Sequence, residues 1–362
     1  MIQVTKPFIP DLDLLNKYLG YAHQGAWLTN NGPLVRELTD RLQDYLGVKN
    51  LILTANGTLA LQVAYKALGL TGNVLTSPFT FVATASAMKW QGITPQFCDI
   101  EPDTLGLSPA AVREFATQRT TALVPVHVYG NPCDVEIFDN ISKEKEIPIV
   151  YDASHAFSIN FKGQSVLNWG DASTLSFHAT KLFHTVEGGG IVFKDSEVFE
   201  RAKRMLNFGL GDPMGDISVP GINAKMSEVH AAYGLSVLES IDYILEKRSE
   251  VLFTYHKHLR EVVEMPKWRV GATQNAAYAP IIMETEKQCI NVLSSLQNVD
   301  VIARRYFYPC LNKLTEYKDN EYDRCATATN VAERIICLPL YPDLSRPDIF
   351  KIIGAVKRGC QQ

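Results

Sequence analysis

The chain has 362 residues, enough for two domains, and its 46% hydrophobic and 20% charged residues are typical of a globular protein. Its formal net charge of −4, from 35 Lys and Arg against 39 Asp and Glu, excludes the basic surface that binding to nucleic acid or anionic membranes requires. No apolar run is long enough to span a membrane and no signal-peptide pattern opens the chain, while seven scattered cysteines without a CxxC pair predict a cytoplasmic protein with reduced thiols and no metal site.

Helical and extended patterns alternate from about residue 34 to residue 240. Apolar residues three or four apart predict helices at 34–46, 59–68, 82–90, 109–117 and 135–145. Short apolar runs predict strands at 51–53, 73–76, 94–98, 121–126, 147–151, 172–177 and 191–193. Because helices separate the strands, we expect right-handed crossovers and an α/β fold, with a mainly parallel seven-stranded sheet between helices.

Beyond residue 240 the pattern changes. A charge-rich helix is predicted from about Ser227 to His258, leading into a smaller α+β domain. We therefore expect an N-terminal arm at 1–12, a large domain at 13–242 and a small C-terminal domain at 243–362. No Gly/Ser-rich linker separates the two domains, so we expect them to pack against each other.

Three segments have the composition of a cofactor site. Ala55–Thr58 lies between a predicted strand and a predicted helix, where free N–H groups bind phosphate; a plain turn capped by Asn56 or Thr58 explains the same residues. Asp152 ends a buried strand, where ligands of α/β sheets bind, although a metal or helix-cap role is equally open. His155 follows it and alone would be read as a core histidine.

The third segment contains Lys181, which precedes the glycine turn at 188–190. A lysine in such a turn is usually solvated, but a desolvated one has a lowered pKa and forms Schiff bases. Phosphate cradle, carboxylate, lysine and a flat aromatic ring together meet the needs of pyridoxal phosphate. Phe81 is the candidate for the ring, and an ordinary core position is its alternative.

Over nearly its whole length the sequence resembles the DegT/DnrJ/EryC1/StrS aminotransferases, fold type I pyridoxal-phosphate enzymes that aminate keto sugars. The matching stretches are 27–33, 55–60, 78–84, 125–131, 151–156, 176–181, 187–190, 221–228, 306–309 and 338–342. Two positions depart from the family pattern: Ala224-Lys225-Met226 stands where Tyr-Arg-Met is usual, and Ala179 where Pro is common. The first departure puts a substrate or nucleotide contact in doubt.

The resemblance implies a role for each matching residue. Lys181 would bind the cofactor as a Schiff base and move protons, Asp152 would hold the pyridinium, and His155 would contact the ring hydroxyl. Phe81 would stack on the ring. The residues implied to hold the phosphate are Gly57, Thr58, Ser176 and, from the partner subunit of a homodimer, Asn223. The residues implied to select the substrate are Trp27, Thr29, Asn30, His184, Glu187 and Tyr308.

The resemblance also implies the reaction, which is transfer of the amino group of L-glutamate to a nucleotide-linked keto-deoxy sugar. His155 favours dTDP-4-keto-6-deoxy-D-glucose, whose product is a 4-amino-4,6-dideoxy sugar for lipopolysaccharide O-antigen or a related surface glycan. Amination of a 3-keto-6-deoxy sugar is the alternative. A regulatory protein that binds pyridoxal phosphate without turnover is the alternative of another class.

Overall fold

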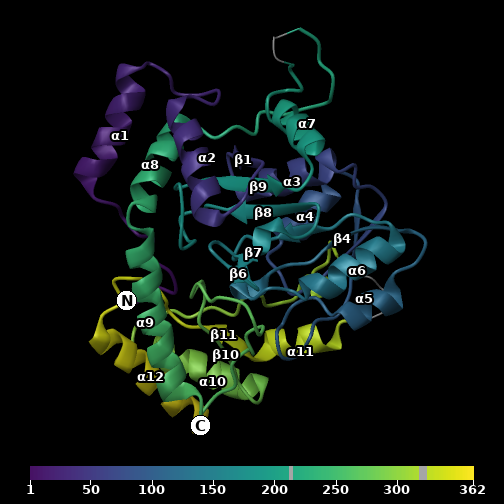
Figure 1. Ribbon diagram of the computed structural model, residues 1–362. Coiled ribbons are helices and arrows are strands. Elements are labelled where there is room, and N and C mark those ends of the chain that lie inside the picture. The colour runs from purple at the N-terminus through teal and green to yellow at the C-terminus, as the bar shows by residue number, and fades with distance from the viewer. Residues whose placement is uncertain (212–214, 318–323) are drawn as a thin grey trace.

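The computed structural model describes residues 1–211, 215–317 and 324–362 (Figure 1). Its α-helices are α1 (Leu12–Gln24), α2 (Pro33–Leu46), α3 (Gly57–Ala67), α4 (Ala83–Lys89), α5 (Pro109–Phe115), α6 (Val135–Lys145), α7 (Ser196–Leu206), α8 (Glu228–Leu238), α9 (Ile241–Leu259), α10 (Glu286–Gln297), α11 (Ala326–Arg334) and α12 (Arg346–Cys360). Its strands are β1 (Leu51–Thr54), β2 (Asn73–Thr76), β3 (Thr94–Phe97), β4 (Thr120–Val124), β5 (Val150–Asp152), β6 (Asn160–Phe161), β7 (Gln164–Ser165), β8 (Ala172–Ser176), β9 (Gly189–Phe193), β10 (Pro280–Ile282) and β11 (Ile335–Cys337).

Within the described residues, the central sheet contains seven strands in the order β1-β9-β8-β5-β4-β2-β3. Its two parts, β1-β9-β8-β5 and β3-β2-β4, are joined by parallel bridges at Leu123–Ile149 and Val126–Asp152. Strand β9 runs antiparallel to β1 and β8, and the other pairs are parallel. The predicted mainly parallel seven-stranded sheet is therefore confirmed. One predicted strand, 147–151, begins later, at Val150, and Pro148 ahead of it lacks the N–H that a ladder needs.

Helices cover both faces of this sheet. Leu51 and Leu53 of β1 point into a core shared with α2, α6 and α8, whereas Ile52 between them points into a second core shared with α3, α4 and α7. This alternation follows from the two-residue period of a strand. The cofactor residues predicted at the ends of the strands thus sit on a sheet that is supported from both sides.

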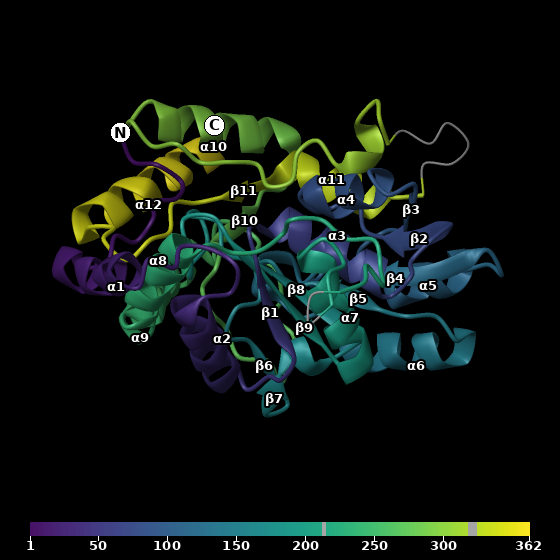
Figure 2. The same ribbon diagram turned by 90° about the horizontal axis from the view of Figure 1, so that it is seen from above.

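The C-terminal part forms a further layer at the bottom of Figure 1, with α10 and α12 side by side in Figure 2. Its core joins α9, α10 and α12 to the two-stranded sheet β10-β11. The N-terminal arm lies along this part, because Ile2 bonds to the backbone on both sides of Val301. A mixed cluster that includes Phe79, Tyr129 and Phe307 packs the two parts against each other. In the described parts of the chain, every helix is too short or too polar to cross a lipid bilayer.

The prediction of one long helix at 227–258 is wrong, because two helices, α8 and α9, occupy this stretch. The break lies at Glu239 and Ser240, where Ser240 has φ −110° and ψ 10°. The Glu239 carboxylate accepts bonds from Arg41 Nη1 (2.9 Å) and Tyr18 Oη (3.2 Å). Contacts with α1 and α2, which lie far away in the sequence, therefore hold the chain at the point where the helices separate.

Glu228 is expected to be a main determinant of stability, because it caps a helix far away in the sequence. Its buried carboxylate accepts from the N–H groups of Leu34 (2.7 Å) and Val35 (3.1 Å) at the start of α2. Glu228→Ala leaves these donors without an acceptor and is expected to lower the free energy of unfolding by about 2–4 kcal/mol. Urea-induced unfolding measures the change. Glu250→Ala, on the exposed face of α9, is the control, and an equal loss in both variants would contradict this role.

Candidate active site

The ends of parallel strands bring the predicted cofactor residues to one edge of the sheet. Asp152 is the last residue of β5 and lies opposite Thr174 on β8, two residues before Ser176. The start of α3, at Gly57, packs against the same end of β8. A small cavity at this edge is lined by residues that include His155, Ser176 and Lys181.

The start of α3 has the features predicted for a phosphate cradle. The Asn56 side chain caps this helix by accepting from Leu59 N (2.8 Å), and the leading N–H groups of Gly57 and Thr58 have no intrahelical partner. A Cβ on Gly57 would lie 2.9 Å from Cβ of Ser176, so only glycine permits this approach. The cradle therefore fits a phosphate group held by Gly57, Thr58 and Ser176 at the positive end of the helix.

The carboxylate of Asp152 is buried and held by three donors. Oδ2 accepts from Thr84 Oγ1 (2.7 Å), and Oδ1 accepts from Ser154 N (3.1 Å) and Oγ (2.6 Å). These bonds fix the orientation of a negative charge at the end of a parallel strand. Such a group suits the protonated nitrogen of a pyridine ring.

His155 is buried beside the carboxylate. Its Nδ1 accepts from Tyr129 N (3.2 Å), so in the neutral ring Nε2 carries the proton. Burial, and then the charge of Lys181, lower the pKa of His155 well below its usual value. The ring is therefore a neutral donor, which suits contact with a ring hydroxyl.

Lys181 follows β8 and reaches back over the same site. Its Nζ donates to Tyr278 Oη (3.3 Å). Burial lowers the pKa of Lys181 to about 8, although Asp152 and Tyr306 oppose the shift. The lowered pKa makes a neutral, nucleophilic amine available near physiological pH.

This pKa leads to a measurable pH dependence. In the cofactor-free protein, the rate at which Lys181 captures added pyridoxal phosphate is expected to rise with pH around a midpoint of about 8, rather than 10.5. The sign follows because only the neutral amine attacks an aldehyde, and a lower pKa exposes that form at lower pH. Borohydride trapping followed by peptide mass spectrometry measures the rate. A midpoint near that of free lysine would contradict a desolvated amine.

The other predicted residues occupy different surroundings. Phe81, Trp27 and Tyr308 are exposed, with the Arg305 guanidinium over the Tyr308 ring. Asn30 lines a separate cavity of about 690 Å³ between α2 and α7. Thr29, Glu187 and Asn223 are also exposed. Oε1 of Glu187 lies 3.6 Å from Nε2 of His178, and the backbone of Asn223 forms an antiparallel β-bridge with that of Asn207.

His184, one of the residues expected to select the substrate, is buried. It is 1% exposed, and its Nε2 lies 2.9 Å from the carbonyl oxygen of Phe8 in the N-terminal arm. Its ring packs at 5.6 Å from that of Tyr233 on α8. These contacts tie the loop after Lys181 to the arm, and in this arrangement the ring does not face solvent.

Sequence reasoning did not single out several residues of the site. Thr84 and Ser154, which orient Asp152, lie inside the matched stretches 78–84 and 151–156, so those motifs contained the signal. Tyr129 likewise lies in the stretch 125–131. Tyr278 lies outside every motif and 97 residues from Lys181, and no sequence pattern pointed to it.

A lysine with a lowered pKa, a buried carboxylate and a helix start that fits a phosphate lie at one edge of this sheet, as a pyridoxal-phosphate enzyme of fold type I requires. The profile of the DegT/DnrJ/EryC1/StrS aminotransferase family matches residues 13–357, and the chain belongs to this family.

Individual relatives and structures are similar over nearly the full length. The chain is 38% identical over 363 residues to a dTDP-4-amino-4,6-dideoxy-D-glucose transaminase of Shigella dysenteriae, with 98% of each chain covered. It is 35% identical to an Escherichia coli transaminase of the same name, covering 97% of this chain and 96% of the relative. The crystal structure of DesI in the presence of its TDP-sugar product superposes with a TM-score of 0.93 at 32% identity, covering 99% of this chain and 94% of DesI.

Proposed function

We propose that this aminotransferase moves the amino group of L-glutamate to dTDP-4-keto-6-deoxy-D-glucose, producing a dTDP-linked 4-amino-4,6-dideoxy sugar. The observation that carries the proposal is the similarity to two transaminases named for that amino sugar, at 38% and 35% identity. The solved relative DesI, described with a TDP-sugar product, supports the same substrate class. Relatives named GDP-perosamine synthase support a place in surface-polysaccharide synthesis such as that of lipopolysaccharide O-antigen.

Each residue of the candidate site has a separate role in the proposed reaction. Pyridoxal phosphate, when bound, supplies an electron sink for the carbanion that forms at the α-carbon of the donor. Gly57, Thr58 and Ser176 would anchor its phosphate, and the charge of Asp152 would keep a proton on its ring nitrogen. Nζ of Lys181, with its pKa of about 8, accepts a proton at near-neutral pH and returns it at the next step. His155 offers Nε2–H to the ring hydroxyl.

We also propose that the working unit is a cytoplasmic homodimer. Large apolar side chains are exposed, including Trp27 (44%), Phe81 (60%), Phe208 (50%) and Ile222 (43%), and a second subunit would cover such side chains. Asn223, exposed beside them, would then reach the partner's cofactor. Sedimentation velocity of the holoenzyme tests the assembly, and a monomer at micromolar concentration would contradict it. The scattered cysteines support the cytoplasmic location.

The substrate is tested by incubating the holoenzyme with glutamate and a panel of nucleotide keto sugars, followed by mass spectrometry of the products. We expect the dTDP-4-keto sugar to be aminated fastest. Faster amination of the 3-keto isomer would overturn the assignment of the carbon. Loss of the yellow colour on addition of glutamate alone reports the first half-reaction, and its absence would favour a protein that binds the cofactor without turnover.

A further inference from the structure

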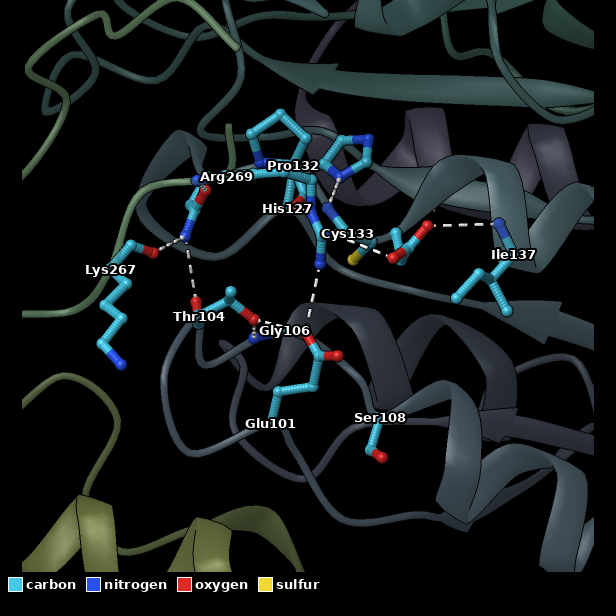
Figure 3. Close-up of polar contacts among 12 residues, drawn as sticks. Glu101, Thr104, Gly106, Ser108, His127, Pro132, Cys133, Ile137, Lys267 and Arg269 are labelled. Carbon is cyan, nitrogen blue, oxygen red and sulfur yellow. Dashed lines mark hydrogen bonds and ion pairs between the residues drawn. The ribbon is translucent and has the colours of Figure 1, made fainter. Parts of the chain in front are cut away.

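Residues 267–278, here called the strap, lie in the chain between α9 and β10. The beginning of the strap is held by several polar contacts. The Arg269 guanidinium bonds to Glu101 (3.1 Å), to Asp134 (2.9 Å) and to the carbonyl oxygen of Pro132 (2.8 Å), as Figure 3 shows in part. The Arg269 N–H donates to Asn131 Oδ1 (2.9 Å). These contacts fix the start of the strap on the loops that follow β3 and β4.

The other end of the strap is held from two sides. Asn275 Nδ2 donates to the carbonyl oxygens of His155 (2.9 Å) and Phe157 (2.8 Å). From α9, Arg248 donates through Nε to Ala276 O (2.9 Å) and through Nη2 to Ala277 O (2.7 Å).

Holding two carbonyl groups with Arg248 costs free energy, because the guanidinium is buried. Arg248 is 5% exposed, and the hydrogen bonds of its guanidinium go to carbonyl oxygens rather than to a carboxylate. Burial of a guanidinium without an anion is unfavourable, and here burial lowers the pKa of Arg248 to about 10. Arg248 therefore fixes the backbone immediately before Tyr278, at a cost in the free energy of folding.

Tyr278 is the residue that these anchors place. Its Oη lies 3.3 Å from Lys181 Nζ, and its ring centroid lies 4.6 Å from that of His155. We propose that Tyr278 is a positioning residue that holds the Lys181 amine in line with the cofactor whenever this amine is not bonded to it. The inference rests on the proposed role of Lys181 as the cofactor lysine, and it holds for any sugar substrate.

A phenol suits this task because it serves both protonation states of the amine. Burial, together with the neighbouring Cys337, raises the pKa of Tyr278 far above neutral although the charge of Arg248 opposes the shift, so the hydroxyl keeps its proton. The oxygen accepts a hydrogen bond from the ammonium form of Lys181, and the O–H donates to the neutral amine. Asp152, His155 and Tyr306 also act on Lys181, but the bond to Tyr278 fixes the position of Nζ.

The test compares Tyr278→Phe with wild type in two measurements. In single-turnover reactions of the holoenzyme with glutamate, we expect the rate at saturation to fall about tenfold to a hundredfold, with the half-saturating concentration unchanged within about twofold. In the cofactor-free protein, we expect the pH midpoint for borohydride-trapped attachment of pyridoxal phosphate to Lys181 to fall by up to about one unit, because the phenol bonds the charged ammonium more strongly than the neutral amine and the variant loses both bonds. Tyr255→Phe, which removes another buried hydroxyl, bonded to Pro339 O at 2.9 Å, is the matched control.

A second variant tests the strap with the phenol intact. Arg248→Lys reaches fewer carbonyl groups, so we expect the attachment midpoint to shift in the same direction by a smaller amount. A wild-type midpoint and rate in Tyr278→Phe would overturn the inference, and so would a wild-type midpoint in folded Arg248→Lys if Tyr278→Phe fails to fold. Failure of the proposed role of Lys181 looks different, because wild-type protein would then carry the trapped cofactor on another residue.

Discussion

Lys181→Ala is expected to abolish steady-state amino transfer, with a loss of at least about 10⁴-fold in turnover. The substitution removes the amine that attaches the cofactor and also the base that moves the proton, and the described site holds Nζ at 3.3 Å from Tyr278 for these tasks. Spectra of the purified protein measure the absorption of the covalently attached cofactor, and product mass spectrometry measures turnover.

The control removes the same charge from an exposed position at the end of β9. Lys194→Ala is expected to keep the cofactor spectrum and turnover of wild type, since this side chain lies outside the site. Normal steady-state turnover by Lys181→Ala would refute the assignment of the catalytic lysine.

Asp152→Asn is expected to lower the rate of the glutamate half-reaction by about 10²–10³-fold. The amide is nearly the same size but neutral, so it no longer stabilises a proton on the cofactor ring. Its NH₂ group would also face one of the donors, Thr84 Oγ1 or the Ser154 pair, which now bond to the carboxylate. Stopped-flow absorbance after mixing the holoenzyme with glutamate measures the rate.

Asp171→Asn is the matched control for this variant. Asp171 precedes β8 at the opposite end of the strands and accepts from Ile149 N (2.8 Å). We expect its half-reaction to stay within about twofold of wild type, because the charge lies at the far edge of the sheet. Equal losses in the two variants would indicate that the carboxylate of Asp152 acts only through folding.

Much of the fold follows from local patterns in the chain. The predicted helix at 135–145 coincides with α6, and the predicted strand at 73–76 coincides with β2, because apolar periodicity reports directly which side of an element is buried. Periodicity failed at 227–258, where the apolar spacing continues but the chain turns at Glu239. The bonds of that carboxylate to Arg41 and Tyr18 involve partners about 200 residues away, which no local window contains.

In the candidate site, too, local motifs predicted one part and the folded chain formed the other. Gly57 begins a helix, Asp152 ends a strand and Lys181 lies in the loop after β8, and the order of a parallel sheet brings such positions to one edge. The sequence motifs therefore predicted the cofactor, which the family confirms, while the residues that would attach it stay a prediction. The larger cavity beside α7, which Asn30 lines, was not foreseen because segments far apart in the chain form its walls.

The length, ordinary composition and slightly acidic charge described an enzyme-sized globular chain, and the spaced motifs alone determined its cofactor chemistry and family. The tertiary structure decided which of these residues share one environment. It buried His184 against the N-terminal arm and placed Tyr278 of the C-terminal part on Lys181. A motif determines the local conformation of a short stretch of chain. Desolvation, hydrogen-bond partners and pKa values instead depend on groups that only the folded chain brings together.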